Sequence, residues 1–289
     1  WSYWVNLGRL DSSGQPMMFL RDTNQRTGVV VGSTRVNGVA SAVSTTGTAL
    51  DVLGTTTQYR TVQDHAKLKL AYDFSATLRA SYTLGYWQNR SDGNPSSYVT
   101  NASTGASVYT GTVNNGVNTY AMPAFTASQE SLTHVMHGLS LKTHTQDVFD
   151  WEVNASLYDY QTDVNRASGT KSGDTTYANA GKITDQNGSG WNNLAVKGTW
   201  RPDGLKGPHL VDFGYQQDHY TLQTITQNTA INWDTAAATT LASKAGGRTH
   251  MHSLYVQDAW RFARFQNSSN SIFNSGLHFR VVGVAHMTQ

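Results

Sequence analysis

Apolar residues alternate with polar or small residues in one segment after another, and helical periodicity is poor along the whole chain. An alternation with a period of two is the signal of a strand that is apolar on one side only. In the clearest segment, 147–160, Trp151 and Val153 share one face, and Glu152 and Asn154 share the other. The pattern predicts an all-β protein whose sheet has one apolar and one polar face.

We expect about ten strands from this pattern. They cover residues 1–9, 16–22, 66–74, 78–86, 131–145, 147–160, 191–200, 208–224, 248–264 and 272–284.

The predicted connections between these strands alternate between short and long. Short turns are expected at 10–15, 73–77, 144–148 and 201–208. Long polar stretches, rich in Gly, Ser, Thr and Asn, occupy 23–56, 89–130, 161–190 and 225–247. Loops beyond roughly 12–15 residues are uncommon in compact soluble domains, whereas outer-membrane barrels combine short periplasmic turns with long extracellular loops. The alternation therefore favours a transmembrane, antiparallel up-and-down β-barrel over a soluble β-sandwich, which stays the alternative.

In such a barrel the apolar face contacts lipid and the polar face lines the lumen. The expected lipid-facing residues are Leu68, Leu70, Tyr82, Leu84, Phe149, Trp151, Val153, Val196, Trp200, Phe213 and Trp260. The expected lumen-facing residues are Lys67, Lys69, Arg79, Lys142, Glu152 and Lys197.

Aromatic residues gather near the short turns, where a barrel places an interfacial girdle. Those in question are Trp1, Tyr3, Tyr72, Phe74, Phe149, Trp151, Trp200, Trp260 and Phe262. One residue fits the pattern badly, because Asp258 lies in the apolar phase between Val256 and Trp260. A β-bulge at this point would turn the carboxylate away from the lipid.

Composition excludes several other classes of protein. Only 14% of the residues are charged and the net charge is +2, with no run of Lys and Arg, so we expect no nucleic-acid partner. The absence of cysteine removes disulfide scaffolds and thiolate metal sites. No apolar stretch approaches the ~18 residues of a membrane helix. The chain starts at Trp1 and ends at Gln289 without a recognisable signal or domain end, which suggests an internal piece of a longer precursor.

Several strand sequences, taken in order, resemble the barrel portion of TonB-dependent outer-membrane receptors. The segments that carry the resemblance are 66–74 (AKLKLAYDF), 138–142 (GLSLK) leading into 150–152 (DWE), 211–216 (VDFGYQ) and 253–262 (SLYVQDAWRF). The similarity covers roughly 57–265, with weaker likeness at 1–4 and 14–16. These are strand patterns and not catalytic signatures.

The resemblance implies a receptor of the bacterial outer membrane that binds a scarce nutrient, commonly a ferric siderophore. Import would draw energy from the TonB complex through an N-terminal plug inside a large barrel. The chain departs from that family in showing no recognisable plug, about half the strands and no aromatic C-terminal residue, and the likeness ends after about Phe265. We therefore expect residues 1–289 to form part of a larger barrel domain whose plug and remaining strands are absent.

Ligand contacts of such a receptor are expected from aromatic residues in the long loops, since large amphipathic side chains carry much of the energy of binding. The candidates are Tyr98, Tyr109, Tyr120, Phe125, Tyr177 and Trp233.

Metal binding and catalysis find little support in the sequence. His250 and His252 point to one side of a strand, whereas His134 and His137 point to opposite sides, and neither pair has the further ligands that zinc needs. We expect no metal, no cofactor and no catalytic residue. A barrel enzyme is a weak alternative, because no Gly-x-Ser-x-Gly motif is evident. A passive porin is a stronger one, because it shares the alternation and the loop asymmetry with the receptors.

Overall fold

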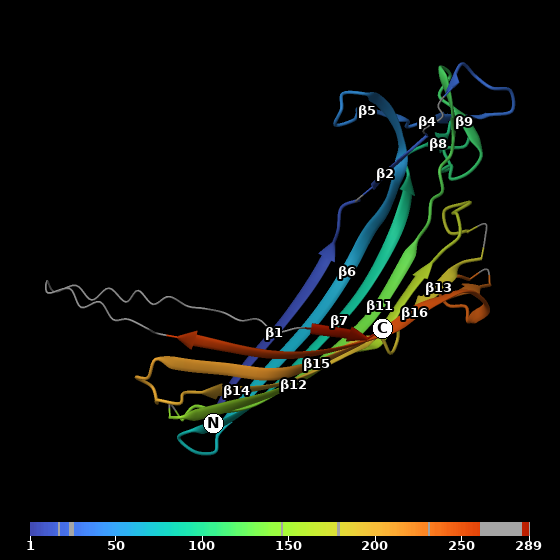
Figure 1. Cartoon of the computed structure of the whole chain (residues 1–289). Coiled ribbons are helices and arrows are strands. Elements are labelled where there is room, and N and C mark those ends of the chain that lie inside the picture. Colours follow the sequence, from blue (N-terminus) through green and yellow to red (C-terminus); the bar gives the residue numbers. More distant parts are fainter. Residues whose placement is uncertain are drawn as a thin grey trace, which may run out of the picture.

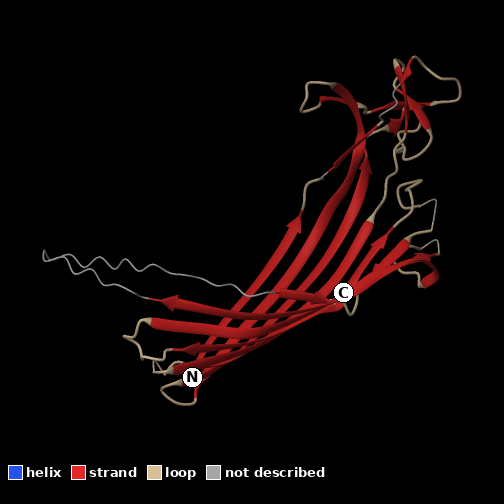
Figure 2. Cartoon of the chain, viewed as in Figure 1, coloured by secondary structure: helices blue, strands red, loops and turns tan. Residues whose placement is uncertain are grey.

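The computed structural model describes residues 1–16, 18–22, 26–145, 147–177, 180–230, 232–260 and 285–288. Every regular element in these ranges is a β-strand (Figure 2), so the prediction of an all-β protein is confirmed. The strands are β1 (Ser2–Ser13), β2 (Met18–Arg21), β3 (Arg26–Thr27), β4 (Thr34–Asn37), β5 (Ala40–Val43), β6 (Ala49–Asp73), β7 (Leu78–Ser97), β8 (Thr100–Asn101), β9 (Thr112–Asn114), β10 (Asn118–Ala121), β11 (Ser128–Thr143), β12 (Phe149–Ala167), β13 (Lys182–Asp185), β14 (Gly190–Trp200), β15 (His209–Thr229), β16 (Ala238–Trp260) and β17 (Ala285–Thr288).

The long strands form one curved antiparallel sheet in which neighbours along the chain are neighbours in space (Figure 1). The order is β1, β6, β7, β11 and β12, then β14 with β13, and finally β15, β16 and β17. Both β13 and β14 pair with β12 on one side and β15 on the other, so these two short strands lie end to end between β12 and β15. Among the described strands β1 pairs with β6 alone, which leaves the sheet open at that edge.

Three of the four predicted short turns are confirmed. In the first, one strand ends at Asp73 and the next begins at Leu78. The second connects Thr143 to Phe149, and the third connects Trp200 to His209. The turn predicted at 10–15 is wrong, because β1 continues to Ser13 and β2 then pairs with the same neighbour, β6. Ser13 lies opposite Arg60 and Met18 opposite Thr56, so the chain keeps its direction here.

The sheet extends well into the stretches that the sequence predicts as loops. β6 already starts at Ala49, and β7 continues to Ser97. The prediction for 225–247 is largely wrong, because β15 reaches Thr229 and β16 begins at Ala238. Backbone pairing satisfies the N–H and C=O groups of these strand ends whatever their side chains are. Strand ends that are polar on both faces lack the alternation that identifies a strand from sequence.

A second, small sheet is built from the long connections, in the order β3, β10, β9, β4 and β8. It lies at the end of the large sheet away from the N-terminus (Figure 1). A cluster of fully buried side chains, Val36, Leu53, Val99, Val113 and Tyr120, forms its core. The main hydrophobic core of the described residues therefore lies among the loops, and the large sheet has no apolar layer packed on it.

Two predictions fall outside the described residues, namely the strand at 272–284 and the position of Phe262. In the part of the chain that is described, no helix is long and apolar enough to cross a membrane.

Candidate functional site

The strand register places all the predicted lipid-facing residues on one face of the large sheet, which we call the apolar face. Leu70 lies opposite Tyr82, and Val153 lies opposite Val196. None of these side chains is buried, and six of them are exposed, among them Val196 at 40% and Trp200 at 45%. Soluble monomers rarely expose a contiguous apolar patch larger than a few hundred Å². An apolar surface spread over eight long strands therefore calls for a covering medium or partner.

The apolar residues form a belt that crosses the hydrogen-bonded rows of the sheet obliquely. One row, followed from β1 to β16, contains Val5, Leu68, Leu84, His137, Leu157, Asn192, His219 and His250. Its first three members are apolar and its last three are polar. On β16 the apolar residues Leu254, Val256 and Trp260 follow this row, nearer to the short turns. A belt of constant height has this slant when the strands are tilted, as barrel strands are by about 35–45°.

Asp258 stays on the apolar face, because no β-bulge interrupts the strand at this point. The register between β15 and β16 is continuous from His209 opposite Trp260 to Gln216 opposite Ser253. The carboxylate is paired with the His209 ring, at 2.8 Å from Oδ2 to Nδ1. This hydrogen bond satisfies one carboxylate oxygen, whereas Oδ1 is buried and has no hydrogen-bond partner among the described residues.

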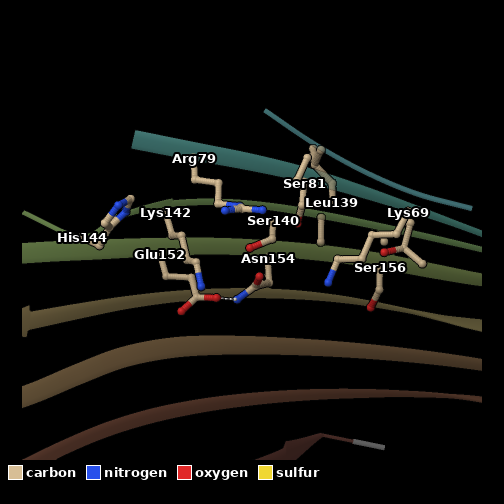
Figure 3. A pocket seen from close by; sticks show the side chains of 14 residues that line it. Lys69, Arg79, Ser81, Leu139, Ser140, Lys142, His144, Glu152, Asn154 and Ser156 are labelled. Atoms are coloured by element: carbon tan, nitrogen blue, oxygen red, sulfur yellow. Dashed lines mark hydrogen bonds between the residues drawn. The ribbon is translucent and has the colours of Figure 1, made fainter. Parts of the chain in front are cut away.

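The opposite, polar face carries the predicted lumen-facing residues, and it is hollowed. A cavity of about 760 Å³ spreads over β6, β7, β11 and β12, and Lys69, Arg79, Lys142 and Glu152 are among its lining residues (Figure 3). This cavity reaches across four neighbouring strands of the polar face.

A second cavity, of about 550 Å³, lies on the loop side and brings together two of the predicted ligand-binding residues. Tyr177 and Trp233 meet edge to face with their ring centroids 5.7 Å apart, and both line this cavity with Asn94, Gln129 and Asp234. Burial raises the pKa of the Tyr177 hydroxyl, with smaller contributions from Tyr109 and Asp234. The lining combines two aromatic rings with amide and carboxylate groups, which suits a small polar ligand.

Arg166 on β12 holds the Trp233 loop in place. Its Nη1 donates hydrogen bonds to the carbonyl oxygens of Trp233, at 3.1 Å, and Ala236, at 2.9 Å. The guanidinium thus satisfies two backbone acceptors of a segment without regular structure. Sequence reasoning missed this residue, because its partners are backbone groups about seventy positions away.

The other aromatic candidates differ in exposure. Tyr98 is 38% exposed, whereas Tyr109, Tyr120 and Phe125 are buried. Tyr109 and Phe125 pack edge to face at 5.3 Å, and the Lys171 ammonium lies 4.5 Å from the Tyr109 ring centroid. These three residues, like Trp233 at 8% exposure, are packed within the loop structure. Loops rich in Gly, Ser and Thr gave no sign of a small apolar core. Contact with a ligand stays a prediction for all six candidates.

An aromatic cluster around His134 on the polar face escaped the sequence reasoning. The His134 ring stacks on Tyr160 at 4.0 Å and lies 5.2 Å from Trp87. Its Nδ1 is 3.0 Å from the Tyr158 hydroxyl, and its Nε2 is 3.0 Å from Asp163 Oδ2. A register shift between Thr133 and His134 sets this arrangement, and no local sequence signal predicts such a shift.

The histidine pairs do not build a metal centre in the described residues. No group of three or more His, Cys, Asp or Glu in these ranges is placed to hold a metal ion. His250 contacts His219, with ring centroids 3.9 Å apart, a neighbour that spacing along the chain did not suggest. His252 instead lies 2.7 Å from the Tyr215 hydroxyl. His137 lies on the apolar face, and its Nδ1 forms a hydrogen bond with the Tyr82 hydroxyl at 2.7 Å.

Comparison with known proteins gives no relative: no protein-family model, curated protein or solved structure matches the chain.

Proposed function

We propose that the large sheet is part of a β-barrel in the bacterial outer membrane, with the apolar face against lipid and the polar face toward the lumen. The observation that carries this proposal is the oblique apolar belt. A soluble sandwich would cover its apolar face with a second sheet. Here the only other sheet of the described residues is small and belongs to the loops.

The dimensions of the strands support the same proposal. A transmembrane β-strand needs about 9–11 residues. β6 has 25 residues and β15 has 21, so both continue far beyond the belt on the loop side. Strands that extend this far beyond the belt and end in a folded loop region suit a protein that captures a ligand outside the cell.

We further propose that the chain is part of a receptor that imports a scarce nutrient with energy supplied by TonB. The strand sequences at 66–74 and 253–262 suggest this function. A ferric siderophore is the first ligand to try, and the cavity beside Tyr177 and Trp233 is its first candidate site. The plug and the TonB contact would come from a region outside residues 1–289.

Uptake measurements test the import proposal. The uptake of radioactive iron from a panel of ferric siderophores is to be measured in cells that make the full-length gene product, in strains with and without TonB. We expect uptake of at least one siderophore that disappears without TonB and without this gene. Uptake that needs the gene but continues undiminished without TonB would overturn the receptor proposal and establish a passive porin.

A further inference from the structure

The cavity on the polar face has a distinct chemistry, and we call it the basin. Its lining includes the cationic residues Lys69, Arg79 and Lys142, the amide Asn154 and the carboxylate Glu152, on four adjacent strands (Figure 3). The basin lies on the short-turn side of the sheet, away from the loop cavity beside Trp233. Nothing in the proposed ligand capture uses it.

Small side chains leave the middle of the basin open. Ser81 lies opposite Ser140, and Gly138 lies between Thr83 and Ser156 in the neighbouring row. A Cβ atom placed on Gly138 would meet nothing closer than the Thr83 Cβ, at 3.8 Å. The space above the glycine is therefore free, and three serine hydroxyls at its edge can donate hydrogen bonds.

The charges of the basin are unbalanced. Within the described part of the chain, Lys69 and Lys142 form no ion pair, while Arg79 is held by Asp73 at 3.6 Å. Arg79 and Lys142 lie directly opposite each other, an arrangement of like charges that destabilises a sheet. Glu152 is opposite Lys142, but its Oε1 accepts a hydrogen bond from Asn154 at 3.0 Å. The basin lining thus carries two ammonium groups outside any ion pair of the described residues and one carboxylate, Glu152, so positive charge is in excess.

We propose that the basin binds a small multivalent oxyanion, a molecule with two or more carboxylate or phosphate groups. The ammonium, guanidinium and hydroxyl groups are all donors, and oxyanion acceptors match them with charge-assisted hydrogen bonds. A volume of about 760 Å³ accommodates a metabolite-sized anion. The anion supplies negative charge to the ammonium groups of Lys69 and Lys142, which form no ion pair within the described part of the chain.

Equilibrium dialysis of the full chain in detergent tests the proposal, with radioactive citrate and pyrophosphate as separate probes at low ionic strength. We expect saturable binding of one or both, with the preferred probe assigning the ligand to carboxylates or phosphates. Lys69→Gln and Lys142→Gln each remove one donor and one charge. We expect each to weaken binding about tenfold, which corresponds to roughly 1.4 kcal/mol.

Lys67→Gln is the matched control. Lys67 lies on the same strand and the same face as Lys69, opposite Gly85, but outside the basin lining. Its substitution should leave the affinity within about twofold, well under the 1.4 kcal/mol of a tenfold change. Equal losses in all three variants would reveal diffuse attraction to a basic surface and overturn the proposal, as would failure of both probes to bind the native protein.

Circular dichroism checks the fold of each variant, and because Lys69 and Lys142 lie on different strands, one variant suffices if the other misfolds. Binding in detergent does not depend on transport, so the two proposals fail independently.

Discussion

Val153 and its neighbour Asn154 point to opposite faces of β12 in the middle of the apolar belt. Val153 lies between Leu141 and Val196 on the apolar face, while Asn154 reaches Glu152 on the polar face. If the belt contacts lipid, the same substitution at the two positions has different consequences, because charge is costly only on the lipid side.

We expect Val153→Arg to destabilise the protein by about 2–4 kcal/mol in a lipid bilayer and Asn154→Arg far less. Urea unfolding in lipid vesicles measures both free energies. Equal destabilisation by the two variants would contradict the assignment of the faces.

Tyr120 in the small sheet is a residue whose environment should be visible in its titration. It is 1% exposed, and its hydroxyl donates a hydrogen bond to Asp51 Oδ2 at 2.7 Å. Burial and the Asp51 carboxylate raise the pKa of Tyr120 to about 12, above its ordinary value of 10.0. The folded state therefore keeps the proton more tightly than the unfolded state does.

Because of this difference in pKa, the contribution of Tyr120 to stability is complete below pH 10.0 and is lost as the pH rises to about 12. Absorbance titration of tyrosinate, native protein minus Tyr120→Phe, should isolate a single hydroxyl that ionises near the upper end of that range. A difference curve centred on the ordinary value would show that Tyr120 is accessible to water.

At the scale of elements, the sequence predicted the strands well where one face is apolar and poorly where both faces are polar. The belt segments of β6, β7, β12 and β15 were found because their side chains alternate. The loop-side segments of these strands were predicted as loops, because backbone pairing does not require particular residue types. The candidate site followed the same rule: aromatic residues were found, but the pairing of Tyr177 with Trp233 and the support from Arg166 depend on register between distant strands.

The connections at the two ends of the sheet should lie on opposite sides of the outer membrane. Ser103 and Ala237 are exposed in the loop-side connections, and Lys206 is exposed in the short turn between β14 and β15. Single cysteines at Ser103 and Ala237 should react with an impermeant maleimide on intact cells, and one at Lys206 only after the outer membrane is opened. Reaction of Lys206→Cys alone on intact cells would reverse the orientation.

At the scale of the whole molecule, the described strands form a curved sheet with two unlike faces and two edges. In lipid, each unpaired backbone group at such an edge costs several kcal/mol. A membrane location therefore requires that further strands complete the barrel. The register places Gln129 of the loop cavity on the same face as Leu139 and places Ser140 of the basin on the other face, so the two cavities lie toward different ends and on different faces of the sheet.

The most direct test of the membrane proposal is the depth of residues that share one hydrogen-bonded row. Leu84 and His250 belong to the same row, but only Leu84 lies within the oblique apolar belt. Nitroxide labels at these two positions, in protein reconstituted into lipid vesicles, can be compared by their collisions with oxygen, which partitions into lipid, and with a water-soluble nickel complex. We expect a label at Leu84 to be reached mainly by oxygen and a label at His250 to be reached mainly by the nickel complex. Equal access of both labels to the nickel complex would contradict this expectation.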